Sequence, residues 1–434
     1  MIHYKMKGAL KYSLAILLSV CSSYLLHAQI DTTFNRTIIN YSLFLALVAK
    51  NNLNYAAQKF NLNIAEANIE LAKVFPDPEI GVGWFDNGMR RMGMGYGFNS
   101  RIGRTIELGG KRRARIDLAK SQSDLTKFLL LDYFRNLRAD ATLNYLNALR
   151  NKSLLDVKIN SYNAVNRLAY SDSIRFKLGS IKDVDSRQSK VEAGAMLNQV
   201  FQTLATWKMS LLNLGLLMSK QSNDSLYFPS GNFNKFDREF DLAQLITEAQ
   251  NNRADLLAAL QNKTTAQKMI QLAKANRIAD LGIGVGVGYA SYDYNIIAPT
   301  PSFTQVSGGL TIPLKFSNKY AGELKMAHYA GTQAELLFRQ VEVQIQVEVT
   351  QAYYDYYTTR QQVLQFNNGL LLEAKKVRDG KIYSYQRGAT SLLEVLNAQR
   401  TYNDVQQSYH ETLYDYAEAL VQLERVAGIW DIDF

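Results

Sequence analysis

The sequence is poor in cysteine and histidine, with one cysteine and four histidines among 434 residues. The cysteine, Cys21, and two of the histidines, His3 and His27, lie in the N-terminal segment 1–28, which reads as a removable secretory signal. The rest of the chain then has no cysteine and two histidines. This excludes a disulfide framework, a cysteine-based zinc site and a cysteine nucleophile, and it argues against a histidine-rich metal site.

The predicted signal, residues 1–28, has a lysine-containing start, a short apolar run from Leu14 to Val20, and a plausible cleavage site after Ala28. Two alternatives stay open: an uncleaved anchor, and a lipid on Cys21, although Val20 stands where a small residue is usual. Removing three lysines leaves 46 basic against 39 acidic residues, so the net charge falls from +10 to +7. The remaining sequence has no run of about 18 apolar residues, and therefore no membrane-spanning helix is predicted.

Proline is also scarce, and none of the six prolines lies within 79–228 or 314–434. Because an interior proline costs a helix about 3 kcal/mol, both stretches permit long helices. Apolar residues recur there every four positions, as from Leu125 to Leu149. We predict one helix over about 110–175, on the order of 100 Å long at about 1.5 Å per residue, and another over about 318–379. Such lengths favour coiled-coil packing.

Glycine is unevenly distributed: nine of the 26 glycines lie within 81–110 and six within 282–309. In both windows apolar residues alternate with small or polar ones over about ten residues, a pattern typical of transmembrane barrel strands. The windows therefore predict two β-hairpins, at about 79–108 and about 280–314. Soluble hairpins covered by helices are the alternative interpretation.

The order helix, hairpin, long helix, helix is predicted twice, and the two halves also match in sequence. Segment 71–83 (LAK, then GVG) corresponds to 272–284 (LAK, then GIG), and segment 176–185 corresponds to 385–394. A duplication is the natural interpretation. We divide the chain into a signal peptide, a first repeat, a polar linker, a second repeat and a tail, at 1–28, 29–219, 220–240, 241–428 and 429–434.

Four strands are too few to close a membrane barrel, because known barrels begin at about eight strands. An open sheet edge in lipid would leave backbone groups unsatisfied, at a cost of several kcal/mol each. If the hairpins lie in a membrane, the barrel must be shared between copies of the chain. Two, three or four copies would give 8, 12 or 16 strands, and the residues alone do not decide among these.

Over about 38–428 the sequence resembles the TolC-type outer-membrane efflux proteins. The resemblance rests on the segments that enter and leave the first hairpin and on the two helix turns: 76–83 (PDPEIGVG), 107–112 (ELGGKR), 176–180 (FKLGS) and 385–399 (YQRGATSLLEVLNAQ). The ELGGKRR stretch is also similar to the heavy-metal efflux subgroup typified by CzcC.

The resemblance implies a mainly α-helical fold with a small β part, in which each chain of a homotrimer contributes four strands to a shared 12-stranded barrel. It places the barrel in outer-membrane lipid and the helical part in the periplasm. The implied partners are a periplasmic adaptor (membrane fusion protein) and, through it, an inner-membrane pump; no cofactor and no nucleic acid are expected. The implied function is a passive exit duct for efflux or secretion, with heavy-metal cations or else drugs and other amphiphiles as substrate.

Gly179 and Gly388 stand where one long helix is expected to reverse into the next, and glycine tolerates the positive φ that such a turn requires. In the family these turns form the periplasmic tip that meets the adaptor. The resemblance therefore implies docking contacts at Arg175, Lys177, Gly179, Ser180, Arg387, Gly388, Ala389 and Ser391. It also implies a gate near the tip, for which the charged candidates are Arg378, Asp379, Asp183 and Asp185.

Simpler interpretations of the same residues stay open. Both turns are compatible with helical hairpin loops that meet no partner. Asp183 and Asp185 also fit the role of acids that complement the dipole in the first turn of a helix.

No carboxylate pair, nucleophile–base set or metal-ligand cluster stands out in the sequence, so no enzymatic activity is predicted. The alternative to an exit duct is a periplasmic or surface coiled-coil interaction protein with soluble β-hairpins. The two hypotheses differ in fractionation: a barrel remains with the outer membrane, whereas a soluble coiled coil is extracted by salt.

Overall fold

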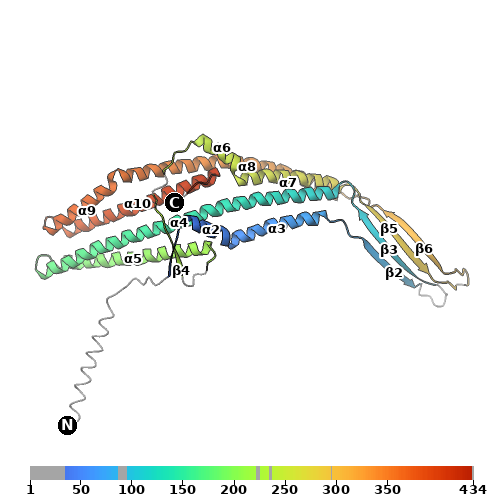
Figure 1. Cartoon of the computed structure of the whole chain (residues 1–434), viewed down its shortest axis with the longest axis horizontal. Coiled ribbons are helices and arrows are strands. Elements are labelled where there is room, and N and C mark those ends of the chain that lie inside the picture. The colour runs from blue at the N-terminus through green and yellow to red at the C-terminus, as the bar shows by residue number, and fades with distance from the viewer. Residues whose placement is uncertain (1–34, 87–94, 221–224, 234–236, 295, 433–434) are drawn as a thin grey trace, which may run out of the picture.

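The computed structural model describes residues 35–86, 95–220, 225–233, 237–294 and 296–432. The predicted signal peptide, 1–28, lies outside the described residues. The molecule is elongated, with a β-sheet at one end and two helical hairpins at the other (Figure 1). A belt of short elements lies around the middle.

Each half of the chain begins with short elements, continues through a β-hairpin, and ends in long helices. The first half consists of β1 (Asn35–Ile39), α2 (Tyr41–Asn51), α3 (Leu53–Lys73), β2 (Glu79–Asp86), β3 (Tyr96–Ile106), α4 (Lys111–Lys177) and α5 (Asp183–Leu217). The second consists of β4 (Ser225–Pro229), α6 (Leu242–Asn252), α7 (Ala254–Asn276), β5 (Leu281–Ala290), β6 (Phe303–Thr311), α8 (Lys319–Gln365), a π-helical turn (Phe366–Leu370), α9 (Leu371–Gln386) and α10 (Leu392–Ala427). The described part of the chain is therefore mainly helical with a small sheet, as predicted.

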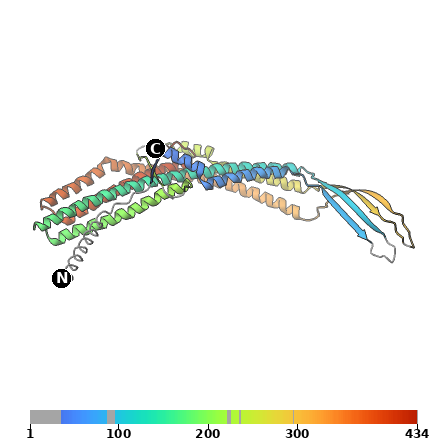
Figure 2. The same ribbon diagram turned by 60° about the horizontal axis from the view of Figure 1, so that its bottom comes forward.

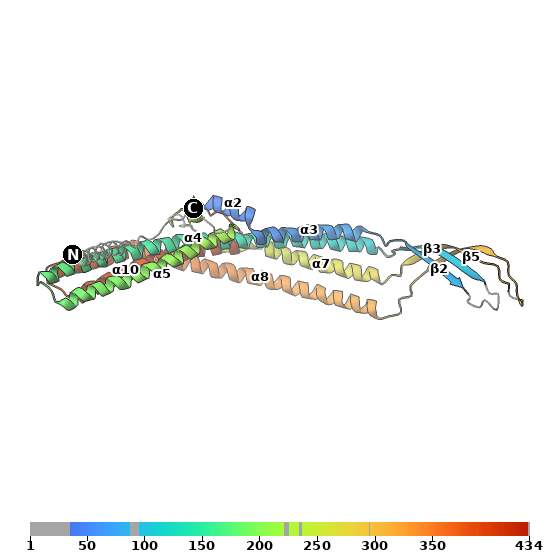
Figure 3. The same cartoon turned by 90° about the horizontal axis from the view of Figure 1, so that it is seen from below.

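The first long helix is confirmed and the second is wrong as one continuous element. Helix α4 runs unbroken over 67 residues and lies along most of the helical body (Figure 3). The predicted helix over about 318–379 is instead divided into α8 and α9 by the π-helical turn. Within that turn Gly369 has φ 115°, which no α-helical residue adopts, so the helix is interrupted there.

The two predicted hairpins are present and join into one antiparallel sheet in the order β2-β3-β5-β6. The hairpins meet where β3 pairs with β5, with Gly97 opposite Ala290 and Ile106 opposite Leu281. Strands β2 and β6 form the two edges. The sheet projects beyond the ends of the helices and is angled away from them (Figure 2).

The two faces of this sheet differ in character. Because side chains alternate along a strand, one face carries Ile80, Val82 and Trp84 on β2, and all three are exposed. Large exposed apolar residues continue across the same face on the other strands: Ile102, Ile283, Val285, Val287, Val306 and Leu310. The opposite face consists mainly of glycines and polar residues, with Phe85 and Phe303 at the strand ends farthest from the helices.

The belt contains a strand pairing that the sequence did not predict. The segment 220–240, expected to be a polar linker, includes β4, which pairs in parallel with β1. Two buried tyrosines hold the segment from opposite halves of the chain. The Tyr145 hydroxyl accepts a hydrogen bond from Ser230 N (3.0 Å), and the Tyr356 hydroxyl accepts one from Arg238 N (2.9 Å).

The main hydrophobic core lies under this belt. Its fully buried members come from α2, α4, α5, α6, α8 and α10, and they include Phe44, Tyr145, Leu214, Ile345 and Leu420. Two smaller clusters lie toward the helix tips. Both long arms of the molecule are therefore anchored at the middle.

Within the described residues, no helix combines the length and the apolar character that crossing a membrane requires.

Candidate functional site at the helix tips

The two helix reversals use the same backbone device. At the first, Gly179 has φ 72°, Ser180 N donates to Arg175 O (2.8 Å), and Gly179 N donates to Phe176 O (2.9 Å). At the second, Gly388 has φ 76°, and Ala389 N and Gly388 N donate to Ser384 O and Tyr385 O (2.9 and 3.0 Å). Both are Schellman turns, in which a left-handed glycine satisfies the last carbonyl groups of the helix. The positive φ predicted at both glycines is confirmed.

The docking candidates lie together at the end of the molecule farthest from the sheet (Figure 1). Seven of the eight are exposed, and Arg175 is half-buried. Arg387 stacks on Tyr383, with its guanidinium carbon 4.1 Å from the ring centroid. Large apolar side chains are also exposed at both turns, Leu178 and Val184 at the first and Leu393 at the second, and the sequence analysis did not single these out as contacts.

Helix α10 begins with a capping box at the second turn. Ser391 is the N-cap, and its hydroxyl accepts a hydrogen bond from Glu394 N (3.4 Å). Glu394 also pairs with Lys381 of α9 at 2.6 Å. The hydrogen bond from Lys381 lowers the pKa of Glu394 to about 2, so this carboxylate is ionised at neutral pH. Ser391 therefore has a structural role at the turn.

One side-chain contact links the two halves of the chain near the tip. Asp172 of α4 is fully buried, and its Oδ1 accepts a hydrogen bond from the Tyr385 hydroxyl of α9 (3.0 Å). Arg175 lies 4.0 Å from the same carboxylate and 4.9 Å from the Tyr385 ring centroid. Burial raises the pKa of Asp172, although the Tyr385 hydrogen bond opposes this. Burial, together with the nearby carboxylate, raises the pKa of Tyr385 to about 12.

The sequence analysis missed Asp172 and Tyr385 as a pair. One signal was available: Tyr385 is the counterpart of Phe176 in the second repeat, so the second turn carries one extra hydroxyl group. A buried hydroxyl needs a partner. The sequence alone did not say which residue supplies it.

The four gate candidates separate into two groups. Arg378 and Asp379 line a cavity of about 410 Å³ between α4, α9 and α10, together with Arg175 and Tyr385. Arg378 bonds to Asp379 (2.5 Å) and stacks on Tyr402 (4.0 Å). The other two, Asp183 and Asp185, lie in the first turn of α5. This is where acidic side chains complement the helix dipole, and Asp183 also pairs with Arg187 at 2.6 Å.

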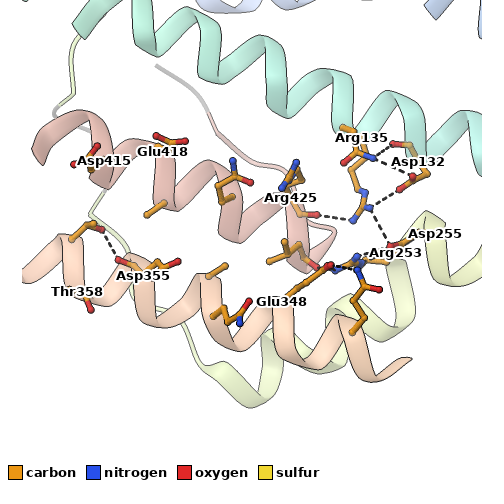
Figure 4. A pocket seen from close by; sticks show the side chains of 18 residues that line it. Asp132, Arg135, Arg253, Asp255, Glu348, Asp355, Thr358, Asp415, Glu418 and Arg425 are labelled. Atoms are coloured by element: carbon orange, nitrogen blue, oxygen red, sulfur yellow. Dashed lines mark hydrogen bonds and ion pairs between the residues drawn. The ribbon is translucent and has the colours of Figure 1, made fainter. Parts of the chain in front are cut away.

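A larger cavity, of about 810 Å³, lies in the belt between α4, α8 and α10 (Figure 4). At one end Arg253 pairs with Asp255 (2.6 Å) and Glu348 (2.7 Å), and Arg135 pairs with Asp132 (2.6 Å). Burial alone would raise the pKa of Asp255, but the hydrogen bond from Arg253 and the charge of Arg135 hold it below its ordinary value. Arg135 also lies 3.5 Å from Asp255, so these ion pairs join α4, α7 and α8.

The other end of this cavity is lined by carboxylates from α8 and α10: Asp355, Asp415 and Glu418 (Figure 4). Nevertheless, across the described residues no three acidic, histidine or cysteine side chains are grouped so as to hold a metal ion.

Comparison with known proteins agrees with this architecture. The model of the outer membrane efflux protein family matches residues 245–429. Over these residues the chain matches the outer membrane efflux proteins, and the solved structures that it resembles show the TolC-type channel fold along most of its length. Members of this family are channels, and the expectation that the chain is not an enzyme is confirmed on that ground.

Individual relatives are distant in sequence but extend over most of the chain. The cobalt-zinc-cadmium resistance protein CzcC of Cupriavidus metallidurans is 23% identical over 393 residues, which cover 88% of each chain. The CmeC outer membrane channel of Campylobacter jejuni has a TM-score of 0.74 at 16% identity, covering 89% of this chain and 85% of its own. CusC has a TM-score of 0.73 at 15% identity, covering 93% and 95%. These two structural likenesses establish the fold.

Proposed function

We propose that this protein is the exit duct of a tripartite efflux or secretion system and works as a homotrimer. Three copies would place four strands each into one 12-stranded barrel. The observation that carries this proposal is the sheet itself: β2 and β6 are open edges, and one face is broadly apolar and exposed. Pairing β2 of one copy with β6 of the next removes both edges, as a lipid environment requires. The two sequence repeats, 29–219 and 241–428, would then alternate around the duct.

The helix tips would form the docking surface for a periplasmic adaptor. In support, the tip lies at the end opposite the sheet, and its docking candidates are mostly exposed. Val184 and Leu393 occupy equivalent positions at the two turns and are 71% and 67% exposed. Paired apolar anchors beside charged residues such as Arg387 suit a protein interface with an apolar centre and a polar rim. An inner-membrane pump, reached through the adaptor, would supply the energy.

The gate would lie beside these turns, on the side toward the belt, at the hydrogen bond between Asp172 and Tyr385. This hydrogen bond connects α9 to α4, while Arg378 and Asp379 line the adjacent cavity. The π-helical turn at Gly369 separates α9 from the body of α8. Breaking the link would let the α9–α10 turn move away from α4, and adaptor docking would drive this movement.

Two matched arginine substitutions on β6 test whether the apolar face of the sheet contacts lipid and whether the protein lies in the outer membrane. Val306→Arg places a charge on the apolar face, where it should cost about 2–4 kcal/mol in lipid. Gln305→Arg places the same charge on the polar face and is the control. We expect Val306→Arg to remove the SDS-resistant oligomer from the outer-membrane fraction and Gln305→Arg to retain it. If both variants fractionate like the wild type, or if salt extracts the wild-type protein, a soluble coiled-coil protein is the better interpretation.

The candidate substrates are of two classes, heavy-metal cations and drugs or other amphiphiles. The relative CzcC is named for cobalt, zinc and cadmium resistance, whereas CmeC is described only as an outer membrane channel. A deletion strain should be compared with its parent on graded cobalt, zinc, cadmium, copper and silver, and on detergents and dyes. Sensitivity confined to metals assigns metal cations, and sensitivity confined to amphiphiles overturns that assignment.

A further inference from the structure

A single arginine lies near the centre of the polar face of the sheet. Arg101 is in the middle of β3 and pairs with Gly81 on one side and Gly286 on the other. Along β3 its neighbours on this face are Asn99, Gly103 and Thr105, since side chains alternate along a strand. In the described part of the chain, no carboxylate lies within ion-pair distance of the Arg101 guanidinium.

The guanidinium lies flat against the strands because the neighbouring positions are glycine. A methyl group added at Gly284 would lie 2.7 Å from Arg101 Nε, and one added at Gly309 would lie 3.7 Å from Arg101 Nη2. Any larger residue at Gly284 would therefore force the Arg101 side chain away from the surface of the sheet. The arginine covers part of β5, and Gly284 and Gly286 are buried although Val285 between them is exposed.

Other polar side chains on this face lie over glycines in the same way. A methyl group added at Gly83 would be 2.6 Å from Asn99 Oδ1, and one added at Gly288 would be 3.1 Å from Gln305 Nε2. The glycine rows thus let long polar side chains lie along the sheet. A barrel interior lined in this way leaves room for a channel. Its electrostatic potential is set by the few charged side chains on the inner face.

The acidic groups of this face are confined to the end nearest the helices. The open cavity there, of about 460 Å³, has Asp77, Glu79 and Asp280 in its lining in addition to Arg101. Asp280 is already paired with Lys111 at 2.5 Å. Glu79 lies opposite Gly103, two positions along β3 from Arg101 toward the helices, or about 7 Å at the usual strand rise. The mid-strand charge is therefore positive.

We propose that Arg101 is an ion-selectivity determinant of the duct, at which anions pass more readily than cations. This inference rests on the proposed trimeric barrel, in which three Arg101 side chains form one ring facing the lumen. Rings of charged side chains select ions of the opposite sign. The substrate class that follows is anionic or neutral solutes, and a metal ion would pass more easily as an anionic complex than as a free cation.

The test is the reversal potential of the full-length protein in planar lipid bilayers under a potassium chloride gradient. Arg101→Gln removes the ring charge, Arg101→Glu reverses it, and Arg101→Lys is the matched control that keeps it. We expect the potassium-to-chloride permeability ratio to rise about threefold or more for Arg101→Gln and further for Arg101→Glu, and to remain at the wild-type value for Arg101→Lys. The difference should fade at 1 M salt, where the screening length is about 3 Å.

A second variant tests whether Gly284 holds the Arg101 side chain against the sheet. Gly284→Ala should lift the guanidinium into the lumen, lowering single-channel conductance while the preference for anions is kept. If Arg101→Glu does not assemble, Arg101→Gln decides the question. Equal reversal potentials for the wild type, Arg101→Gln and Arg101→Lys overturn the role of Arg101. Absence of a membrane oligomer in the wild type, or of any conductance in both the wild type and the gate variant Tyr385→Phe, instead overturns the proposed duct, so the two failures are distinguishable.

Discussion

The two halves of the molecule make the same connection with different chemistry. In the first half Asn52 joins α2 to α3, and its Nδ2 donates to Leu217 O at the end of α5 (3.0 Å). In the second half Arg253 joins α6 to α7, and its Nη1 donates to Val426 O at the end of α10 (3.1 Å). The two donors stand at corresponding positions of the repeats, and so do the two acceptors. The shared contact closes each half at the belt, but only at the second junction is the donor a buried charged residue, Arg253.

The second half has charged or polar side chains and a helix interruption that the first half lacks. Substituting these residues one at a time measures what each contributes to stability. For each substitution the free energy of unfolding is measured by denaturant titration of the detergent-solubilised protein.

Arg253→Asn converts the second junction into the first. Arg253 is buried, and its loss leaves Asp255 and Glu348 without their main partner, so we expect destabilisation of about 3–5 kcal/mol. The matched change Asn52→Ala should cost about 1–2 kcal/mol, the loss of a cap and one neutral hydrogen bond. Because the pKa of Asp255 is lowered in the folded state, the Arg253 contribution should decline as the pH falls below about 4. Equal costs for the two junctions would refute the distinction.

Glu424→Gln removes a buried carboxyl group from α10, where the first half has Gly215. Burial raises the pKa of Glu424 to about 8, although Arg238 at 3.0 Å opposes this. A raised pKa means that the folded state binds this proton more tightly, so stability should fall as the pH rises from about 4.5 to about 8. The Gln variant should lose this dependence and be about 2–3 kcal/mol more stable than the wild type at pH 8.5, since one pKa unit is worth about 1.4 kcal/mol and the bond to Arg238 is weakened. Parallel pH profiles for the two proteins would contradict this assignment.

Gly369→Ala tests the interruption between α8 and α9. An L-residue with a side chain is strained at positive φ, so we expect a cost of about 1–2 kcal/mol, or a straightened helix with an altered tip. The control is the corresponding position of the first repeat, in the uninterrupted α4, where Asn160→Gly should cost less than about 1 kcal/mol. Hydrogen exchange across 362–374 would distinguish strain from straightening. A stabilised variant with unchanged exchange would show that the turn does not need glycine.

Tyr385→Phe makes the second turn resemble the first, which has Phe176. The change removes one hydrogen bond to buried Asp172, and we expect the smallest loss of stability, about 1 kcal/mol. If the link closes the duct, single-channel conductance and uptake of bulky antibiotics should rise. Tyr383→Phe, on the exposed side of the same helix, is the control. Unchanged conductance in Tyr385→Phe would exclude this bond as the gate.

The features that the sequence predicted are those whose cause is local. The turns at Gly179 and Gly388 need a positive φ, which glycine supplies on its own, and the hairpins follow from alternation within each strand. Helix α4 was predicted because nothing in its sequence interrupts it. The interruption at Gly369 was not predicted, since a single glycine inside a helical pattern is usually tolerated at modest cost.

The features that the sequence did not predict depend on residues far apart in the chain. The Asp172–Tyr385 bond joins positions 213 residues apart, and neither residue is unusual in its own segment. The belt strand β4 lies in a polar stretch whose pairing partner is at the other end of the first half. Comparison of the two repeats could have pointed to Tyr385, because it adds a hydroxyl group where Phe176 has none.

The parallel pairing of β1 with β4 also governs the order in which the protein can fold. Asn35 pairs with Ser225 and Ile39 with Pro229, so β1 has no partner until the whole of the first repeat has been made. Closing a loop of this length is slow because the entropy is lost before the contact forms. During export the N-terminal strand must therefore stay unpaired until the belt segment arrives. A chain that ends before Ser225 would keep that edge open permanently, as a target for aggregation or proteolysis.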